Sequence, residues 1–304
     1  MTAPDKKKLE DLIGACLNDK LRELQDGGYG PLDLNIKVSL IKKFVFESIS
    51  GGSSPIVEAM KHLVDLANAT NRVVSFVLDG TTHFATGILV GSRYVLTASH
   101  LFFERESRKL IDSTRLKRIT AEVQTITVGS ALVPVGTNSS RLYHPETNDW
   151  LVDPPIKDGV AQRELLNLDF VIIKLDKPLG DDDVGDGERG WFQIPTADTA
   201  EVLTADLGFR IFQYLDRGPL LTSSGFVHQV NPDGMRILHT ASTAGSASGA
   251  PLLSDEGNLI GIHVSGCASN ERPKFNRAIP IRRIAEIIDE PDANGKTIRD
   301  RLKA

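Results

Sequence analysis

The chain has 304 residues, of which 40% are hydrophobic and 25% charged, and its formal net charge is -5. This is the composition of an ordinary soluble globular protein, large enough for one large domain or for two. Acidic and basic residues intermingle, and no Lys/Arg stripe carries interleaved aromatic residues, so a nucleic-acid partner is not expected.

The first residues do not have the pattern of a targeting segment. Lys6, Lys7 and Lys8 lead into the amphipathic stretch LEDLIGACLNDKLREL, whereas a signal peptide needs an unbroken apolar core. No apolar run is long enough to span a membrane. The two cysteines, Cys16 and Cys267, lie far apart in the sequence, which favours free thiols in a reducing compartment. We therefore expect a cytoplasmic protein without a membrane partner.

Residues 1–70 are predicted to form a small helical domain. Apolar side chains recur there every three or four positions, the spacing of one helix face: Leu9, Leu12, Ile13, Leu17, Leu21 and Leu24. The stretch GGYGP at 27–31 ends this helix, SGGSSP at 50–55 ends a second, and Pro55 is placed to begin a third.

From Arg72 onward the pattern changes to that of a mainly β domain, assigned to residues 71–304. Short runs rich in Val, Ile, Thr and Phe are separated by Gly, Asn, Asp and Pro, which is typical of a sandwich or barrel. The expected strands are 72–78, 87–91, 93–99, 121–129, 169–175, 209–215, 225–230, 235–241, 259–266 and 277–281. A solvated acidic loop is expected at 180–190, and a helix at 281–290 near the C-terminus.

Three separated segments of the β region carry the residue types that nucleophilic acyl transfer needs. In ATGILVGSRYVLTASHLF, residues 85–102, a strand runs into a hydroxyl-rich corner that presents His100. NLDFVIIKLDKPL places Asp169 at the start of an apolar strand, where a buried carboxylate needs a partner. TAGSASGAPLL, residues 243–253, places Ser248 before Gly249, which permits a close backbone approach, and before Pro251, which stiffens the exit.

Together these segments resemble those of trypsin-like serine peptidases, whose fold is the chymotrypsin-like double β-barrel. TASH resembles the family's TAAH motif around the histidine, LDFVIIKLDKPL the pattern around the aspartate, and GSASGAP the G-x-S-G-x-P box around the nucleophile. The order His, Asp, Ser also matches, over about residues 72–290. Leu101 stands where the secreted, disulfide-linked branch has cysteine, which places the chain nearer the bacterial, disulfide-poor relatives.

The resemblance implies a catalytic triad. Ser248 would attack the scissile carbonyl of a protein or peptide substrate, His100 would carry the proton, and Asp169 would orient the ring of His100. The backbone amides of Ser246 and Ser248 would form the oxyanion hole. An esterase is not expected, because no G-x-S-x-G motif stands on a strand-to-helix turn.

The residues themselves leave an alternative open at each position of the triad. If these residues have no catalytic role, His100 is a core histidine, Asp169 is a strand cap and Ser248 is an inert turn serine. The replacements would then be Asp149 or Asp153 for the acid, and Ser246 or Ser242 for the nucleophile.

Two positions depart from the family pattern. Ser246 replaces the usual glycine two residues before the nucleophile, which predicts an oxyanion hole that forms only when a substrate or regulator binds, or a catalytically inactive binding module. Ala247 replaces the aspartate of zymogen-type relatives, which argues against activation by a freed N-terminus.

Substrate preference is predicted from a further resemblance. GIHVSG at 261–266 resembles the GIHxGG strand of glutamate-specific bacterial relatives, and His263 and Thr243 occupy the positions that bind the substrate carboxylate there. An imidazole and a hydroxyl can both donate hydrogen bonds to a carboxylate. We therefore expect cleavage after glutamate, with a strand histidine of no specificity role as the alternative.

The remaining chemistry-bearing residues are assigned no catalytic role. No metal-ligand spacing links the other histidines, and neither a metal nor a cofactor is expected (His62, His83, His144, His228 and His239). For residues 1–70 we expect an adaptor that recruits the enzyme or binds a regulatory protein. An inhibitory pro-segment cleaved at one of its glycine-rich breaks and a structural cap are the alternatives.

Overall fold

The computed structural model describes residues 69–78, 82–103, 111–125, 129–134, 141–145, 167–184, 188–214, 220–266 and 275–303, all within the compact unit Asn68–Ala304. The predicted helical domain at residues 1–70 lies outside the described residues except for its last two positions, which are helical. The two cysteines and the alternative acids Asp149 and Asp153 also lie outside them.

The first half of the described chain folds into a half-barrel. Its seven-stranded antiparallel sheet has the order β5-β4-β1-β2-β3-β7-β6. The strands are β1 (Val73–Leu78), β2 (Thr82–Gly91), β3 (Tyr94–Thr97), β4 (Ile119–Thr125), β5 (Gly129–Pro134), β6 (Arg141–Tyr143) and β7 (Val171–Lys174). Five of the six residues of β1 and all four of β3 are buried, because these β-branched and aromatic side chains pack on both faces of the sheet. Phe76 and Phe102 meet edge to face inside it, with ring centroids 5.6 Å apart.

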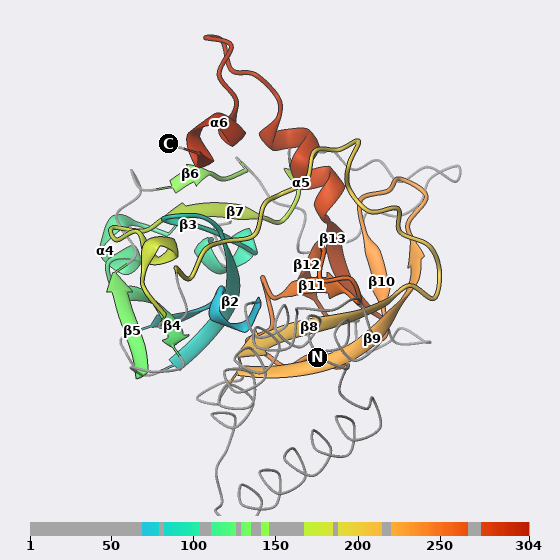
Figure 1. The fold of residues 1–304 in the computed structure, drawn as a ribbon, viewed down its shortest axis with the longest axis horizontal. Coiled ribbons are helices and arrows are strands. Elements are labelled where there is room, and N and C mark those ends of the chain that lie inside the picture. The colour runs from blue at the N-terminus through green and yellow to red at the C-terminus, as the bar shows by residue number, and fades with distance from the viewer. Residues whose placement is uncertain are drawn as a thin grey trace, which may run out of the picture. The chain divides into compact units, whose positions relative to one another are not determined.

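The second half forms a closed antiparallel barrel with the order β10-β13-β12-β11-β8-β9. Its strands are β8 (Gly208–Tyr214), β9 (Leu220–Val230), β10 (Ile237–His239), β11 (Pro251–Ser254), β12 (Leu259–Ser265) and β13 (Asn276–Pro280). Phe209, Ile211 and Leu252 are among the buried side chains that fill its core. The first strand of this barrel, β8, contacts β1 and β2 of the half-barrel, so the two sheets lie against each other (Figure 1).

The mainly β architecture expected from the sequence is confirmed, and a barrel with a half-barrel is consistent with a chymotrypsin-like double β-barrel. Each of the ten expected segments contains or overlaps a strand. The segment expected at 121–129 spans the end of β4 and the first residue of β5. The sequence did not predict β5, β6 or β11 as separate strands, and β6 and β11 have only three and four residues.

The acidic loop expected at 180–190 is anchored more deeply than its composition indicates. It begins in the short 3-10 helix η4 (Leu179–Asp181), and its acidic residues Asp181 and Asp183 are exposed. Arg189, however, is only 2% exposed, and its guanidinium donates to the carbonyl oxygens of Asn71 and Leu179. The loop is therefore fastened to the start of the half-barrel by a buried cation.

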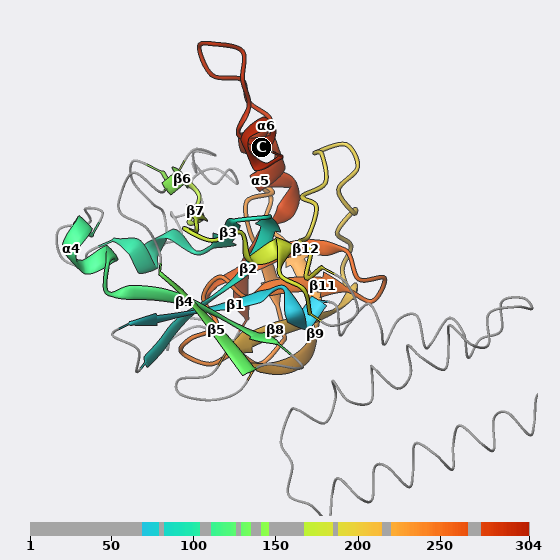
Figure 2. The ribbon, with the colours of Figure 1, turned by 60° about the vertical axis from the view of Figure 1, so that its left-hand side comes forward.

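Two helices close the described chain. Isoleucine and alanine side chains spaced by a helical turn bury one face of α5 (Ile281–Ile288), which packs on β12 and β13. The short helix α6 (Ile298–Leu302) begins with a capping box between Thr297 and Asp300. Figures 1 and 2 show α5 and α6 as neighbours. A further short helix, α4 (Ser113–Leu116), precedes β4. No helix among the described residues is long and apolar enough to cross a membrane.

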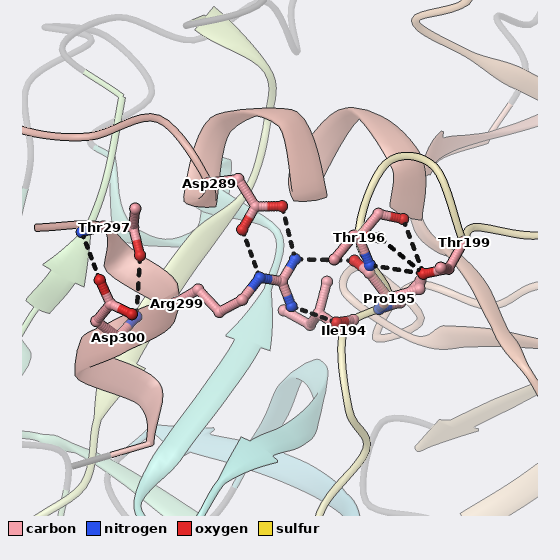
Figure 3. A network of polar contacts seen from close by, with 8 residues as sticks. All are labelled: Ile194, Pro195, Thr196, Thr199, Asp289, Thr297, Arg299 and Asp300. Atoms are coloured by element: carbon pink, nitrogen blue, oxygen red, sulfur yellow. Dashed lines mark hydrogen bonds and ion pairs between the residues drawn. The ribbon is translucent and has the colours of Figure 1, made fainter.

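Arg299 of α6 ties the end of the chain to the rest of the protein. Its guanidinium forms a two-point ion pair with Asp289, at the end of α5 (Figure 3). It also donates to the carbonyl oxygens of Ile194 and Pro195, in the segment between the two sheets. A planar guanidinium suits this arrangement because its donors are fixed in one plane.

Candidate active site

The first predicted site residue, His100, is held at the end of a half-barrel strand. Strand β3 ends at Thr97, and the 3-10 helix η1 (Ser99–Phe102) then turns the imidazole out of the sheet. The side chain of His100 is 17% exposed, so one edge of the ring reaches solvent.

Asp169 lies directly against this ring. It comes two residues before β7, slightly earlier than the sequence indicated, and its side chain is fully buried. Its Oδ2 atom lies 2.7 Å from Nδ1 of His100. Its Oδ1 atom accepts two further hydrogen bonds of 2.8 Å, from the hydroxyl of Ser99 and from the backbone amide of His100. The buried carboxylate is therefore satisfied by three donors, as a buried charge requires.

Ser248 approaches His100 from the other barrel. Its Oγ atom lies 3.1 Å from Nε2 of His100. Because Nδ1 of the ring faces a carboxylate, which can only accept, the hydrogen of a neutral His100 belongs on Nδ1. Nε2 is then free to accept the hydroxyl hydrogen of Ser248. The structure thus brings the three predicted residues into one line of hydrogen bonds, from carboxylate to imidazole to hydroxyl.

Glycine is required directly after Ser248. Gly249 has a φ of +85°, in the region that side chains rarely adopt. A Cβ atom here would lie 2.1 Å from the carbonyl oxygen of Thr86 and 2.1 Å from the hydroxyl of Thr97. The nucleophile turn, which we define as residues 244–250, therefore passes against the backbone of the half-barrel without room for another atom.

The residues before Ser248 form a tight, buried backbone. The amide of Ala247 donates to the carbonyl of Ala244 (3.0 Å), and the carbonyl of Ala247 accepts from the amide of Ala250 (2.8 Å). Ser246 is only 3% exposed. Among the described residues the non-glycine with a positive φ is Asp206, so Ser246 stays in the region open to every L-residue. Its side chain therefore causes no left-handed backbone strain at this position.

Two buried histidines lie next to this turn. Nδ1 of His263 lies 3.2 Å from Nε2 of His239. The backbone of His263 is bonded on both sides to the nucleophile turn: its carbonyl accepts from the amide of Gly249, and its amide donates to the carbonyl of Ala250. The sequence singled out His263 but gave His239 no functional role, since only the pairing of β10 and β12 with β13 brings the two rings together.

Burial keeps both rings neutral. It lowers the pKa of His239 from 6.5 to about 4. Burial, together with the nearby His239 and His100, lowers the pKa of His263 well below its ordinary value. Nδ1 of His239 is buried and has no hydrogen-bond partner in the described part of the chain. An unpaired buried N–H group is rarer than an unpaired acceptor. The favoured arrangement therefore has His239 donating from Nε2, which leaves His263 with its hydrogen on Nε2.

Thr243 belongs to the same polar cluster. Its hydroxyl accepts a hydrogen bond of 3.0 Å from the side-chain amide of Asn276, and the same amide also donates to the carbonyl of Ala241 (2.7 Å). Asn276 lies opposite His239 in the pairing of β10 with β13. Because Asn276 supplies the hydrogen here, the hydroxyl hydrogen of Thr243 is available for another acceptor. Asn276 had no signal in the sequence, since its role depends on strand register.

No group of three or more His, Cys, Asp or Glu side chains could hold a metal ion within the ranges that the structure covers. The site brings together a hydroxyl, an imidazole that can accept its hydrogen and a buried carboxylate.

Comparison with known proteins gives one family. Residues 85–262, more than half of the chain, match the family described as "Trypsin-like peptidase domain". Among solved structures, the apo form of the MamO protease domain from Magnetospirillum magneticum matches with a TM-score of 0.48 and 16% sequence identity, covering 73% of this chain and 97% of that one. A comparison with curated proteins found no match.

Proposed function

Because the chain belongs to the trypsin-like peptidase family, we propose that it is a serine endopeptidase in which Ser248, His100 and Asp169 act as a triad. The observation that carries this proposal is the unbroken line of hydrogen bonds from Asp169 through His100 to Ser248, at 2.7 and 3.1 Å. A buried acid, a partly exposed imidazole and a hydroxyl in this order are what acyl transfer requires.

In the proposed reaction, Oγ of Ser248 bonds to the scissile carbonyl carbon while its proton moves to Nε2 of His100. The carbon–nitrogen bond then breaks as the same proton passes to the leaving amine. A water molecule repeats the sequence on the acyl-enzyme, releasing the acid and restoring Ser248. Asp169 stabilises the imidazolium that forms in each half of the reaction.

The amides of Ser246 and Ser248 are the proposed donors to the oxyanion. Loss of one such donor typically lowers kcat by about a hundredfold or more. The serine at position 246 is the feature that favours the second candidate, an inactive binding module. Under the leading proposal, Ser246→Gly raises kcat by freeing the amide to reorient. An inactive module stays inactive with glycine there.

A fluorophosphonate probe tests the nucleophile directly, since it reacts with activated serine hydroxyls. The wild type is expected to label at one site, and Ser248→Ala is expected to abolish the label. Ser242→Ala is the matched control, because Ser242 is an exposed serine in the same segment. Labelling that persists in Ser248→Ala would exclude Ser248 as the nucleophile. A wild type and a Ser246→Gly variant that both fail to label would favour the binding module.

We further propose that the enzyme prefers glutamate before the scissile bond. The favoured tautomer of the buried pair leaves His263 with an Nε2–H donor, and the bond from Asn276 leaves Thr243 with a hydroxyl donor. Two neutral donors suit an oxygen-bearing side chain and offer nothing to Lys or Arg.

Peptides that differ only at this substrate position test the preference. Glutamate is expected to be cleaved fastest and glutamine more slowly, because its carbonyl keeps one acceptor but lacks the charge. Lysine and phenylalanine are expected to be cleaved at least about tenfold more slowly than glutamate. Thr243→Val should narrow the difference between glutamate and phenylalanine, whereas Thr222→Val, at an exposed position of β9, should leave it unchanged. Fastest cleavage after lysine, arginine or phenylalanine would overturn the assignment.

Regulation or recruitment through residues 1–70 is the last element of the proposal. At the start of the described unit, the carbonyl of Asn71 accepts from Arg189 (2.7 Å), and Nε of Arg72 donates to the carbonyl of Arg189 (3.1 Å). The Arg72 guanidinium also lies 5.2 Å from the ring centroid of Phe192. These contacts join the segment that follows residue 70 to the connector between the two sheets. Deletion of residues 1–68 that changes neither kinetics nor partner capture would refute this role.

A further inference from the structure

Thr86 of β2, to which the sequence assigned no role, bonds to the nucleophile turn through both its backbone and its side chain. It is fully buried. Its backbone amide donates to the carbonyl of Ser248 (2.9 Å), and its hydroxyl donates to the carbonyl of Ser246 (2.9 Å). The hydroxyl also accepts from the amide of Tyr214 in β8 (3.0 Å). We infer that Thr86 is a positioning residue that fixes the backbone on both sides of Ser248, an inference that rests on the proposed function.

The roles of donor and acceptor at the Thr86 hydroxyl are unambiguous. The backbone amide of Tyr214 can only donate, and the carbonyl of Ser246 can only accept. The single hydroxyl hydrogen must therefore point at Ser246. One side chain of the half-barrel thus joins two segments of the other barrel, the nucleophile turn and β8, through groups that lie out of contact with water.

Successive peptide units around Ser248 are each held by a bond. The unit from 246 to 247 is held by the Thr86 hydroxyl at its carbonyl and by Ala244 at its amide. The unit from 247 to 248 is held at its carbonyl by the amide of Ala250. Because a trans peptide points its N–H opposite to its C=O, this bond also sets the direction of the Ser248 amide.

The unit from 248 to 249 is held at both ends as well. Its carbonyl accepts from the backbone amide of Thr86, and its amide donates to the carbonyl of His263. Thr86 therefore supplies a bond to the first and the third of these three units. By contrast, a Cβ atom built on Gly245 meets nothing within 4 Å, so the unit that carries the Ser246 amide has open space beside it. Of the two proposed oxyanion donors, Ser248 is the one that Thr86 keeps in place.

Thr86 also connects this turn to the base. Its carbonyl accepts a 2.7 Å hydrogen bond from the hydroxyl of Thr97, the last residue of β3, three residues before His100. The segment that carries His100 and the segment that carries Ser248 therefore both bond to Thr86. The position of Thr86 thus affects the distance between Nε2 of His100 and Oγ of Ser248. A shift of this residue would lengthen that distance, and a misplacement of reacting groups by about 1 Å can lower the rate by about a hundredfold.

Two variants at one position separate this role from ordinary packing. Thr86→Val keeps the shape and both backbone bonds but removes the hydroxyl, whereas Thr86→Ser keeps the hydroxyl. The matched control is Thr120→Val in β4, because the hydroxyl of Thr120 is buried without a hydrogen-bond partner in the described part of the chain. Steady-state kinetics on a glutamyl peptide, fluorophosphonate labelling rates and thermal unfolding are measured for all three.

For Thr86→Val we expect kcat and the labelling rate to fall together by about ten- to a hundredfold, with KM within about twofold of wild type. Thr86→Ser should recover kcat to within about threefold, and Thr120→Val should retain it. Equal losses in Thr86→Val and Thr86→Ser, or a lower melting temperature in Thr86→Val with unchanged kcat, would overturn the inference.

A wild type that does not label would mean that the proposed function fails, and a second measurement then decides the role of Thr86. Amide hydrogen exchange at Ala247 and Gly249 reports on the turn without catalysis, and neither amide bonds directly to Thr86. Faster exchange of both in Thr86→Val than in Thr120→Val supports the positioning role. Unchanged exchange refutes it.

Discussion

Replacing Asp169 by asparagine tests the proposed triad, because it changes which ring nitrogen of His100 carries the hydrogen. In the native protein Oδ1 of Asp169 accepts from the Ser99 hydroxyl and from the backbone amide of His100, while Oδ2 faces Nδ1 of His100. The side-chain carbonyl of asparagine must take the Oδ1 position, because the backbone amide of His100 would clash with an NH₂ group there. The NH₂ group then lies about where Oδ2 was, facing Nδ1.

Two N–H groups cannot face each other at the 2.7 Å that separates Oδ2 from Nδ1 in the native protein. His100 must therefore move its hydrogen to Nε2, where it points at Ser248 and can no longer accept the hydroxyl proton. The loss of the base in serine peptidases by this route lowers kcat by about ten-thousandfold. This corresponds to about 5 kcal/mol of transition-state stabilisation.

The assay compares kcat on a peptide substrate and the fluorophosphonate labelling rate for wild type and Asp169→Asn, with folding checked by circular dichroism. Asp149→Asn and Asp153→Asn are the controls, since these acids are the sequence-based alternatives to Asp169. Both are expected to stay within about twofold of wild type, because the proposed triad takes its acid from Asp169. A folded Asp169→Asn variant that keeps more than about a tenth of the wild-type kcat would refute the assigned role, as would a large loss in either control.

Three further changes probe the supports of the site. Gly249→Ala should lower the free energy of unfolding by more than about 3 kcal/mol in urea titrations. The φ of +85° at this position disfavours a side chain, and the new Cβ would clash with Thr97. A stability near that of wild type would contradict the close contact between this turn and the half-barrel. Wild-type stability should fall as pH drops from 6.5 toward 4, by up to about 1.4 kcal/mol per pH unit for His239, because the unfolded chain binds a proton that the folded chain excludes. His239→Gln should flatten this dependence, and an unchanged slope would show that His239 takes up its proton in the folded state. Arg299→Gln should lower the melting temperature by a few degrees, since it breaks the partly exposed ion pair with Asp289, but should leave kcat unchanged. A lower kcat with an unchanged melting temperature would place Arg299 in the catalytic machinery.

The site residues that could be predicted from the sequence are those that their immediate sequence neighbours identify. His100 follows a hydroxyl-rich corner, and Ser248 stands beside a glycine and near a proline, so each motif signals its own turn. Thr86 has no such signal, because residues 85–91 of its strand are all buried and only the contact with the second barrel gives its hydroxyl a role. Asn276 and His239 likewise acquire their partners through strand register, which short sequence patterns do not specify.

The strands also divide into those that could be predicted from the sequence and those that could not. Long apolar runs such as those of β1 and β12 were anticipated, since most of their residues are buried. The strands β6 and β11 are too short to show a period, and β11 begins with a proline, which usually indicates a turn. Arg189 gave no indication of burial because the residues around it are acidic and glycine-rich. Its burial depends on carbonyl groups distant in the sequence, at Leu179 and Asn71.

The pairing of β13 with both β10 and β12 also governs when the proposed activity can arise during synthesis. The barrel that carries Ser248 closes only through residues 276–280, so the ribosome must translate these residues first. A nascent polypeptide can assemble the half-barrel, with its imidazole and carboxylate, while the hydroxyl still lacks a finished scaffold. Late closure would thus keep an unfinished protease from cutting itself or the proteins around the ribosome.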